Sequence, residues 1–404
     1  MRILVAGAVS VYFFSAAILS SSLFAAVYEV HPGVYASYEY TDNYFGTAHD
    51  KAKESIYLVG PSIDLSVSTP FLNWENTGRI ARTYHRKYDE EESLEALLES
   101  HASASWTHHT LDLGYTYSVT SSRESLEDPL GKTRVQSGTL GYSYQLGLAT
   151  LLSLGYTGTY ENNPYPEENL TTQGPSISLT HQLTRRQTLS LTYDYLYHRY
   201  EESENTWVST SSAHWGYLVT SRLELGTGFR YMHEDRGRAP SENIYNATIT
   251  AGYVLTRNTD IDISGGYSWL NMEEQDRQGS FTLDAEMRTE TRYNVFLLRT
   301  SRGYTAEFTT DRYGTYITKS ASISWERILT RVLSSTLTGT YDARSPTADT
   351  EAQKEIDFVG RFSVIWEPVE YLSLTPFFER LQHGYEISET ERENRYGITI
   401  EGRY

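Results

Sequence analysis

Alternation of apolar and polar residues, sustained from about residue 27 to the last residue, constrains the fold of this chain most strongly. Tight turns that are basic or built from small residues recur near residues 71, 108, 148, 185, 221, 257, 291, 330 and 369, roughly 34–40 residues apart. Each repeat holds two strands of about 10–14 residues, one tight turn and one longer loop, which is the pattern of a transmembrane β-hairpin. Residues 27–404 are therefore predicted to form a single β-barrel, without a separate soluble domain.

The side chains of the predicted strands separate onto two faces. In residues 188–200, Leu189, Leu191 and Tyr193 face one way, whereas Ser190 and Asp194 face the other. The same period of two runs through 111–119, 259–269 and 355–366 and predicts strands, in a soluble sheet as much as in a membrane barrel. The polar face carries hydroxyls, glycines and charges over nearly every hairpin, as a water-filled lumen requires.

Aromatic residues favour the membrane barrel over a soluble β-protein. The chain has 34 tyrosines, whose apolar ring and wet hydroxyl suit a membrane interface. Trp106, Trp325 and Trp366 stand just before tight turns, and Trp207 and Trp269 stand at the opposite, loop ends of their strands. Two tryptophan belts at opposite strand ends are what a bilayer with two interfaces demands.

The strand count follows from the turns. Nine short periplasmic turns, with both termini on the periplasmic side, give an all-β antiparallel barrel of about 20 strands. Two regions leave 18 strands as an alternative. Residues 74–106 alternate poorly, and residues 89–98 could form a short helix in a loop. Residues 293–306 are ambiguous because the apolar run Val295, Phe296, Leu297 and Leu298 places apolar side chains on both faces.

Residues 1–26 are predicted to be a secretory signal peptide. Arg2 precedes an apolar run from Ile3 to Leu19, and small residues follow at Ala25 and Ala26, where cleavage is expected. The alternative is a membrane-anchoring helix, but nothing downstream reads as soluble cargo for an anchor. A signal peptide followed by a barrel places the protein in the outer membrane of a Gram-negative bacterium.

Charge and composition exclude several partners. The formal net charge of −18 argues against nucleic acid, and the absence of cysteine excludes a lipoprotein anchor, disulfides and thiolate metal sites. The long loops are acidic and the short turns are basic, as in Glu201-Glu202-Ser203-Glu204 and Arg185-Arg186. Outer-membrane lipids and lipopolysaccharide are the expected surroundings, and divalent cations bridging loop carboxylates to lipopolysaccharide phosphates are a hypothesis.

Both ends of the barrel resemble known outer-membrane patterns. The apolar positions Tyr396, Ile398, Ile400 and Tyr404 resemble the C-terminal strand that the barrel assembly machinery reads, although Gly402 stands where an apolar residue is usual. Residues 34–44, with an Asp-Asn turn, and residues 55–63, with Gly60-Pro61-Ser62-Ile63, resemble the opening of the β-barrel porin-2 families. This resemblance implies an outer-membrane barrel, some relatives of which are associated with exopolysaccharide systems.

Signals for catalysis or metal binding are poor. No Gly-x-Ser-x-Gly elbow occurs, so no enzyme activity and no cofactor are predicted. His101, His108 and His109 cluster in the sequence. On one strand His101 and His109 would share a face about 27 Å apart, too far for one metal ion, and histidines at a membrane interface explain them better.

Charged residues of the polar face are the remaining candidates for a site. By parity the following project into the lumen: Asp112, Asp194, Glu224, Arg230, Asp262, Asp284, Glu286, Arg288, Glu355, Asp357 and Arg361. They could form a ladder that solvates and rigidifies the wall, or a transverse field that orders solutes at a constriction.

A passive channel for small solutes is the predicted function. About 20 strands leave an aqueous pore unless loops fold inward, and the acidic excess predicts a mild cation preference. An export conduit for exopolysaccharide, working with periplasmic partners, is one alternative and should show a lumen lined by aromatic ladders or by one charge sign. A non-conducting structural or assembly barrel is another. The sequence leaves the solute and the oligomeric state open.

Overall fold

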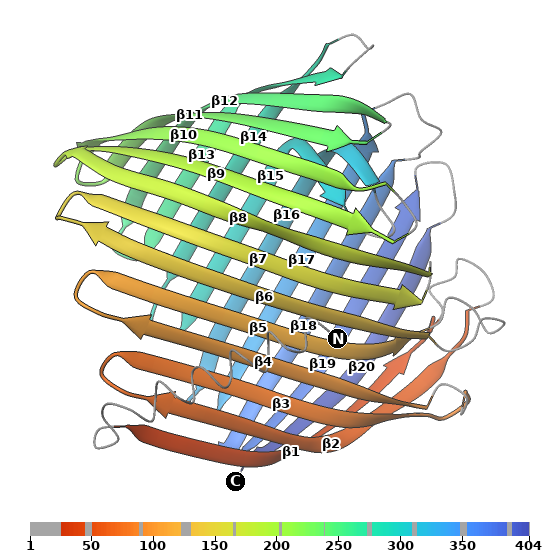
Figure 1. Ribbon diagram of the computed structural model, residues 1–404. Helices are drawn as coiled ribbons and strands as arrows, with labels where there is room; N and C mark the ends of the chain where they lie inside the picture. Colours follow the sequence, from red (N-terminus) through yellow and green to blue (C-terminus); the bar gives the residue numbers. More distant parts are fainter. Residues whose placement is uncertain are drawn as a thin grey trace.

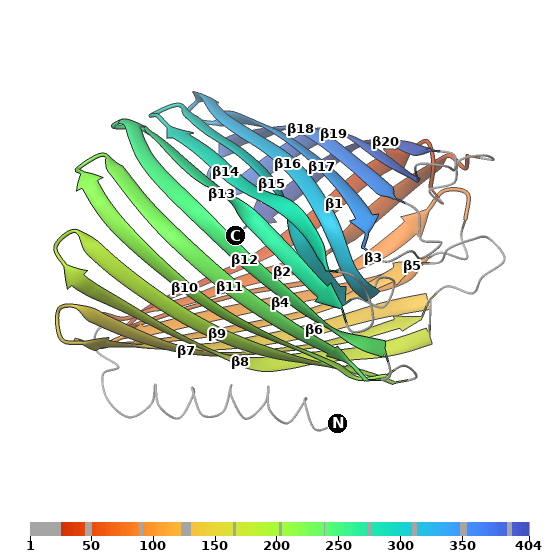
Figure 2. The ribbon, with the colours of Figure 1, turned by 90° about the horizontal axis from the view of Figure 1, so that it is seen from above.

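The chain folds into one closed antiparallel β-barrel of 20 strands (Figures 1 and 2). The computed structural model describes residues 26–44, 51–88, 92–122, 131–164, 167–201, 204–237, 239–272, 277–308, 313–347, 354–385 and 390–403. Each strand pairs with its neighbours in sequence, and β1 pairs with β20 to close the wall. Apart from Ala26, the predicted signal peptide lies outside these ranges, as does Tyr404. Among the described residues no helix is long and apolar enough to cross a bilayer.

The strands of the first half are β1 (Val27–Thr41), β2 (Glu54–Ser68), β3 (Leu72–His85), β4 (Ser93–Ser105), β5 (His109–Ser122), β6 (Gly131–Leu146), β7 (Thr150–Pro164), β8 (Glu167–Thr184), β9 (Gln187–Tyr200) and β10 (Thr206–Thr220). Those of the second half are β11 (Leu223–Arg236), β12 (Ala239–Thr256), β13 (Thr259–Met272), β14 (Gln278–Glu290), β15 (Asn294–Phe308), β16 (Tyr313–Thr330), β17 (Leu333–Pro346), β18 (Glu355–Val369), β19 (Leu372–Tyr385) and β20 (Glu391–Arg403). All nine predicted tight turns separate an even-numbered strand from the next odd-numbered one, and the count of 20 is confirmed.

The two ambiguous regions are strands. The short helix considered for residues 89–98 is wrong for its described part, because Ser93–Ser105 forms β4, in which Leu94 and Leu98 share one face and Glu95 and Glu99 the other. Residues 89–91 lie outside the described ranges. The apolar run at Val295–Leu298 lies in β15, which pairs with β16 along its whole length.

A threonine at the end of the incoming strand shapes several tight turns. The hydroxyl oxygens of Thr184, Thr220, Thr256 and Thr330 each accept a hydrogen bond, at 3.2 Å, from the backbone N–H two residues later. In the longer turns after β2 and β14, the Thr69 hydroxyl accepts from the N–H groups of Phe71 and Leu72, and the Thr291 hydroxyl accepts from the N–H of Asn294. These side-chain bonds stabilise the turn without a glycine, because a threonine hydroxyl can replace a backbone acceptor. The Leu146–Thr150 turn instead uses Gly147 at a positive φ of 69°.

The two faces of the wall have opposite character. Strand register carries one alternation continuously around the barrel, and one face presents large exposed apolar residues such as Ile249, Ile263 and Phe362. The other face presents mainly hydroxyls, glycines and charges. Apolar residues exposed on this scale suit lipid and not water, since soluble monomers rarely expose large contiguous apolar patches.

The seam between β1 and β20 is reinforced by side chains. Nine residue pairs join the two strands, from Gly33–Arg403 to Thr41–Arg395. At the loop end, the Asp42 carboxylate accepts hydrogen bonds from the backbone N–H and the side-chain amide of Asn394, both at 2.7 Å. The neighbouring Asn43 is fully buried and donates to the Arg392 carbonyl. The Asp-Asn pair noticed in the sequence therefore ties the first strand to the last.

Glycine at position 397 allows close packing beside this seam. A Cβ on Gly397 would lie 2.4 Å from the Phe377 ring and 2.5 Å from the Tyr38 carbonyl oxygen, whereas a Cβ on Gly402 would meet nothing within 4 Å. Gly397→Ala is expected to destabilise the folded barrel by about 1–3 kcal/mol through overpacking. Heating before electrophoresis in detergent measures this as a lower temperature for loss of the compact, fast-migrating form.

Gly402→Ala is the matched control on the same strand and should leave that temperature unchanged. If both variants unfold at the temperature of the unsubstituted barrel, the close contact at Gly397 is not a constraint on the seam.

Candidate functional site in the barrel lumen

One contact identifies the inner face of the wall. The Thr315 hydroxyl on β16 donates to the Glu234 carboxylate on β11 at 3.3 Å, although four strands separate β11 from β16 in the wall. Two strands so far apart in a barrel can touch only across its interior. The face that carries Glu234 therefore faces the lumen, and the exposed apolar face points outward.

Register places all eleven candidate charges on this inner face, distributed over the six strands β5, β9, β11, β13, β14 and β18: Asp112, Asp194, Glu224, Arg230, Asp262, Asp284, Glu286, Arg288, Glu355, Asp357 and Arg361. Trp207, Trp269, Trp325 and Trp366 lie on the outer face, and Trp106 lies in the turn after β4. Tyr396, Ile398 and Ile400 also point outward from β20. The eleven charges do not form one cluster; they fall into two groups and isolated positions.

The first group surrounds Asp357 on β18. Arg344 on β17 contacts its carboxylate at 2.6 Å, and His383 on β19 bonds to the other carboxylate oxygen. Farther along the same strand, Arg361 lies 3.9 Å from Glu379 and over the ring of Phe377. The Arg344–Asp357 pair is largely shielded from water, so it holds its geometry better than an exposed ion pair.

Sequence reasoning missed the arginine that links this group to the seam. Arg395 on β20 bonds to Glu393 at 2.7 Å and 3.0 Å, and lies within 4.0 Å of Glu39 on β1 and of Glu379 on β19. Arg79 makes a second bridge, reaching from β3 over the Tyr35 ring to Glu401 on β20. Strand register places these residues on the inner face, and the closed barrel brings β3 and β20 within reach of each other.

The second group is an acidic strip on β11 to β14. Asp262 stands directly opposite Glu286 on β14 and Gly252 on β12. Because Gly252 has no side chain, the Asp262 carboxylate and the Glu224 side chain both border the space above it. Glu286 is paired with Arg299 at 2.7 Å. Asp284 stands opposite Ser264, with no cation across the ladder. The strip thus carries more negative than positive charge.

Other candidate charges stand apart from both groups. Asp112 faces Ser103 and Gly141, and Asp194 faces Thr210 and Ser176. Arg230 faces Ser212 and Asn246. These isolated charges solvate the wall and are not part of a common binding centre.

A shallow hollow of about 320 Å³ lies on the inner wall of β3 to β6. Its lining includes Glu75, Glu99 and His101 beside the short side chains of Thr116 and Ser137. The prediction that His101 and His109 share a face is wrong, because they belong to the adjacent strands β4 and β5. His101 pairs with Gly114 on the inner face, and His109 stacks on Tyr144 on the outer face. Among the described residues no group of three or more His, Asp or Glu is arranged to hold a metal ion.

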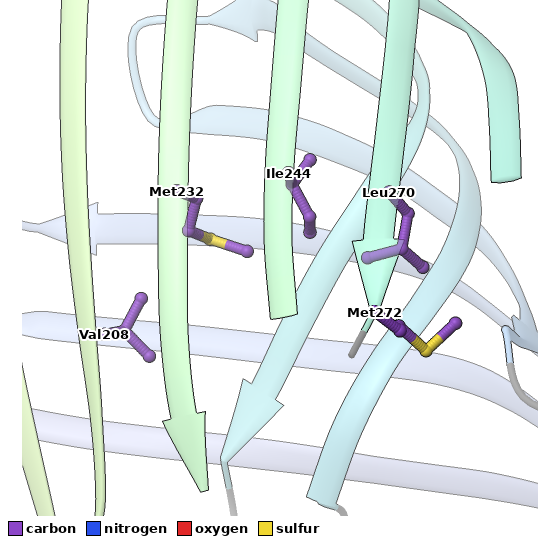
Figure 3. Packing of buried hydrophobic residues seen from close by; sticks show 5 residues of the cluster. All are labelled: Val208, Met232, Ile244, Leu270 and Met272. Carbon is purple, nitrogen blue, oxygen red and sulfur yellow. The ribbon is translucent and has the colours of Figure 1, made fainter. Parts of the chain in front are cut away.

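The hairpin β15–β16 leaves the wall and enters the lumen. β15 pairs with β14 only as far as Leu283–Arg302, so residues 278–282 of β14 have no β15 partner, whereas β15 and β16 remain paired to Phe308–Tyr313. Figure 3 shows the two cyan strands passing behind the ends of β12 and β13 at an angle to them. On β16, the last pair with β17 is Tyr316–Pro346. The segment beyond the ladders with β14 and β17, residues 303–308 and 313–315, is called the inner hairpin.

An apolar patch on the inner wall receives the inner hairpin. Val208, Met232, Ile244, Leu270 and Met272, from β10 to β13, form the buried cluster of Figure 3, with Leu270 0% exposed. Tyr304 of β15 packs against it. On a fully paired wall Tyr304 would face lipid, because it shares a face with Leu298 and Phe296. Apolar residues on a lumen face were not expected, and the hairpin that covers them explains their burial.

Two hydrogen bonds hold the inner hairpin from the other side. The Thr347 hydroxyl, just after β17, donates to the Thr315 carbonyl at 2.8 Å, and the Gln278 amide on β14 donates to the Thr347 carbonyl at 2.9 Å. β14 and the end of β17 therefore meet over the place that the hairpin has left. The lumen is narrowed on the loop side of the barrel.

Comparisons with known proteins match the fold and no family. No protein-family model and no curated protein matches the sequence. Among solved structures, the siderophore receptor PirA from Pseudomonas aeruginosa superposes with a TM-score of 0.52 and 11% identity, over 92% of this chain and 80% of the receptor. The copper transporter OprC gives 0.54 and 9% over 93% and 83%, and the iron transporter FrpB from Neisseria meningitidis gives 0.54 and 9% over 92% and 82%. At such identities the likeness concerns the fold.

The fold and the outward-facing apolar side chains together place this protein in the bacterial outer membrane. A closed antiparallel barrel with a lipid-compatible exterior and short turns on the side of both termini is the architecture of that membrane.

Adjacent residues on β13 test the assignment of faces. Because the chain has no cysteine, Asp262→Cys and Ile263→Cys each introduce a unique thiol. In vesicles, a charged water-soluble thiol reagent should modify Asp262→Cys and leave Ile263→Cys unmodified, since the first faces the lumen and the second faces lipid. Mass spectrometry of the intact protein measures both yields. Equal modification of the two would refute the assignment.

Proposed function

We propose that this barrel is a channel for passive diffusion of small hydrophilic solutes across the outer membrane. The observation that carries the proposal is the mainly polar inner face of the closed wall, which is interrupted by the apolar patch on β10 to β13 that the inner hairpin covers. An inner surface of hydroxyls, glycines and charges remains hydrated, and a wall of 20 strands is wide enough to enclose water. The solved structures of similar fold include iron and copper transporters, which supports transport as the general role.

The acidic strip supports a preference for cations. Glu224, Asp262, Asp284 and Glu286 crowd the inner face of neighbouring strands, and only Glu286 has a close arginine partner among the contacts of this strip. Across the lumen, the arginines around Asp357 and Glu379 are themselves paired with carboxylates. A permeating ion therefore passes a net negative wall, which raises the local concentration of cations.

The position of the aromatic residues favours diffusion over polysaccharide export. An export conduit is expected to present stacked rings to the polymer along the lumen. The ring pairs on neighbouring strands, such as Tyr38–Tyr57, Tyr231–Tyr245 and Phe378–Tyr396, lie instead on the outer face. On the inner face, Tyr35 and Phe377 are covered by arginine side chains. The opening resemblance to β-barrel porin-2 families is compatible with either role.

Ion selectivity in planar bilayers tests the proposal. With a salt gradient across the membrane, the reversal potential should show a higher permeability for potassium than for chloride. A carboxylate about 8 Å from a passing ion in water contributes roughly 0.5 kcal/mol, so the combined variant Asp262→Asn, Asp284→Asn and Glu286→Gln should lower the permeability ratio by at least about twofold.

Glu370→Gln is the control, because Glu370 lies in the short turn after β18 and outside the strip. Its permeability ratio should stay close to that of the unsubstituted barrel. Absence of any conductance would overturn the channel proposal, and an anion-favouring reversal potential would overturn the cation preference.

A further inference from the structure

The ladder between β14 and β15 stops while both strands continue. Eight pairs join them, from Glu290–Val295 to Leu283–Arg302, without a register shift. The next residues of each strand, toward the loop end, are Thr282 on β14 and Gly303 on β15. The side chains of Ser280 and Thr282 both bond to Arg302: the Ser280 hydroxyl contacts its guanidinium at 3.5 Å, and the Thr282 hydroxyl donates to its carbonyl at 3.0 Å. Side chains thus replace the ladder at the point where it ends.

Continuing the same register defines a second position for the inner hairpin. Thr282 would then stand opposite Gly303, Phe281 opposite Tyr304, and Ser280 opposite Thr305. Side-chain orientation agrees with this register, because Phe281 and Tyr304 both lie on the outward-facing set of their strands, and Ser280 and Thr305 on the inward-facing set. The sequence therefore suits a fully paired wall, with an aromatic pair added to the lipid side.

The present position has its own compensating contacts. Tyr304 packs on the apolar cluster around Leu270, Thr315 bonds to the buried Glu234, and Gln278 and Thr347 close the wall over the hairpin. Gly303 is where the ladder ends, and a Cβ there would approach the Thr282 hydroxyl to 3.3 Å. Tyr304 has an apolar neighbour in each position: the cluster around Leu270 in one and Phe281 in the other. Two packed arrangements of one element are what a switch requires.

We propose that the inner hairpin is a gate with two positions: docked in the lumen against β10 to β13, as in this structure, and zipped into the wall beside β14. Docking narrows the loop-side mouth of the lumen, and zipping widens it. The Gln278–Thr347 hydrogen bond, which joins β14 to the end of β17, is the latch that must break between the two; the Thr347–Thr315 bond continues the β16–β17 ladder and is kept in both. The effect on flux rests on the proposed channel function, whereas the two positions do not.

Engineered disulfides distinguish the positions, since the chain has no native cysteine to interfere. Ser280→Cys with Thr305→Cys would face each other on the zipped ladder, where directly opposite residues lie about 4.5–5.5 Å apart between Cα atoms, within the range of a disulfide. Glu234→Cys with Thr315→Cys would link the docked hairpin to the inner wall. Thr305→Cys with Thr318→Cys, whose hydroxyls are 2.9 Å apart within the hairpin, is the matched control.

Both crossing pairs should form disulfides under mild oxidation of the folded barrel in vesicles, measured by gel mobility and peptide mass. Adding Gln278→Ala, which weakens the latch, should raise the yield of the Ser280–Thr305 link at least twofold; Gln382→Ala is its control. In bilayers, the oxidised zipped pair should conduct several-fold more than the oxidised docked pair, and reductant should abolish the difference. The control pair should change neither.

Failure of the Ser280–Thr305 pair to cross-link, under conditions in which the control pair cross-links fully, would overturn the proposal. So would equal conductance of the two oxidised crossing pairs. A barrel that cross-links in both positions but conducts in neither would refute the channel function and leave the two positions of the hairpin established, because gel mobility does not depend on ion flow.

Discussion

The pairing of β1 with β20 is the constraint on which the rest of this structure depends. In a bilayer an unpaired strand edge exposes backbone N–H and C=O groups to hydrocarbon, at a cost of several kcal/mol for each group. Nine residue pairs remove both edges at once, and Asp42, Arg79 and Arg395 add side-chain bridges across or beside the join. Only after closure do the two faces of the wall become an inside and an outside. The lumen, its charges and its narrowing are all consequences of that single junction.

Closure also explains why one hairpin can leave the wall. The β15–β16 hairpin departs on the loop side of the barrel, where strands extend toward water and the penalty for an interrupted ladder is lower. There the Thr282 hydroxyl donates to the Arg302 carbonyl, the Ser280 hydroxyl contacts the Arg302 guanidinium, and Gln278 meets the chain after β17. The inner wall provides an apolar receiving surface centred on Leu270, which is fully buried. Side-chain contacts thus join the strands where the β14–β15 ladder ends.

Much of the architecture follows from local rules that a sequence displays directly. Period-two alternation and recurrent turns predicted about 20 strands, the positions of the nine tight turns and the face of the eleven candidate charges, because each depends on neighbours along the chain. Failures arose where distant strands meet. Arg79 reaches Glu401 because the sheet closes into a circle, and Thr315 reaches Glu234 because the inner hairpin enters the lumen. The apolar residues Met232, Ile244 and Leu270 on a lumen face broke the alternation, and that break was the available sign that something packs against them.

The threonine-capped turns and the seam differ greatly in the length of chain between the residues that they bring together. A tight turn brings together residues a few positions apart, so every hairpin of this barrel is assembled from local contacts whose entropic cost is small. The Asp42–Asn394 contact joins residues 352 positions apart, and the Gly33–Arg403 pair of the same seam joins residues still farther apart in the chain. Nineteen strand pairings can therefore accumulate as an open, curved sheet before the twentieth forms. Until then the unpaired backbone groups of β1 and β20 can pair with another chain. The aggregation risk of the nascent barrel therefore depends on protection of these two edges more than on formation of the hairpins.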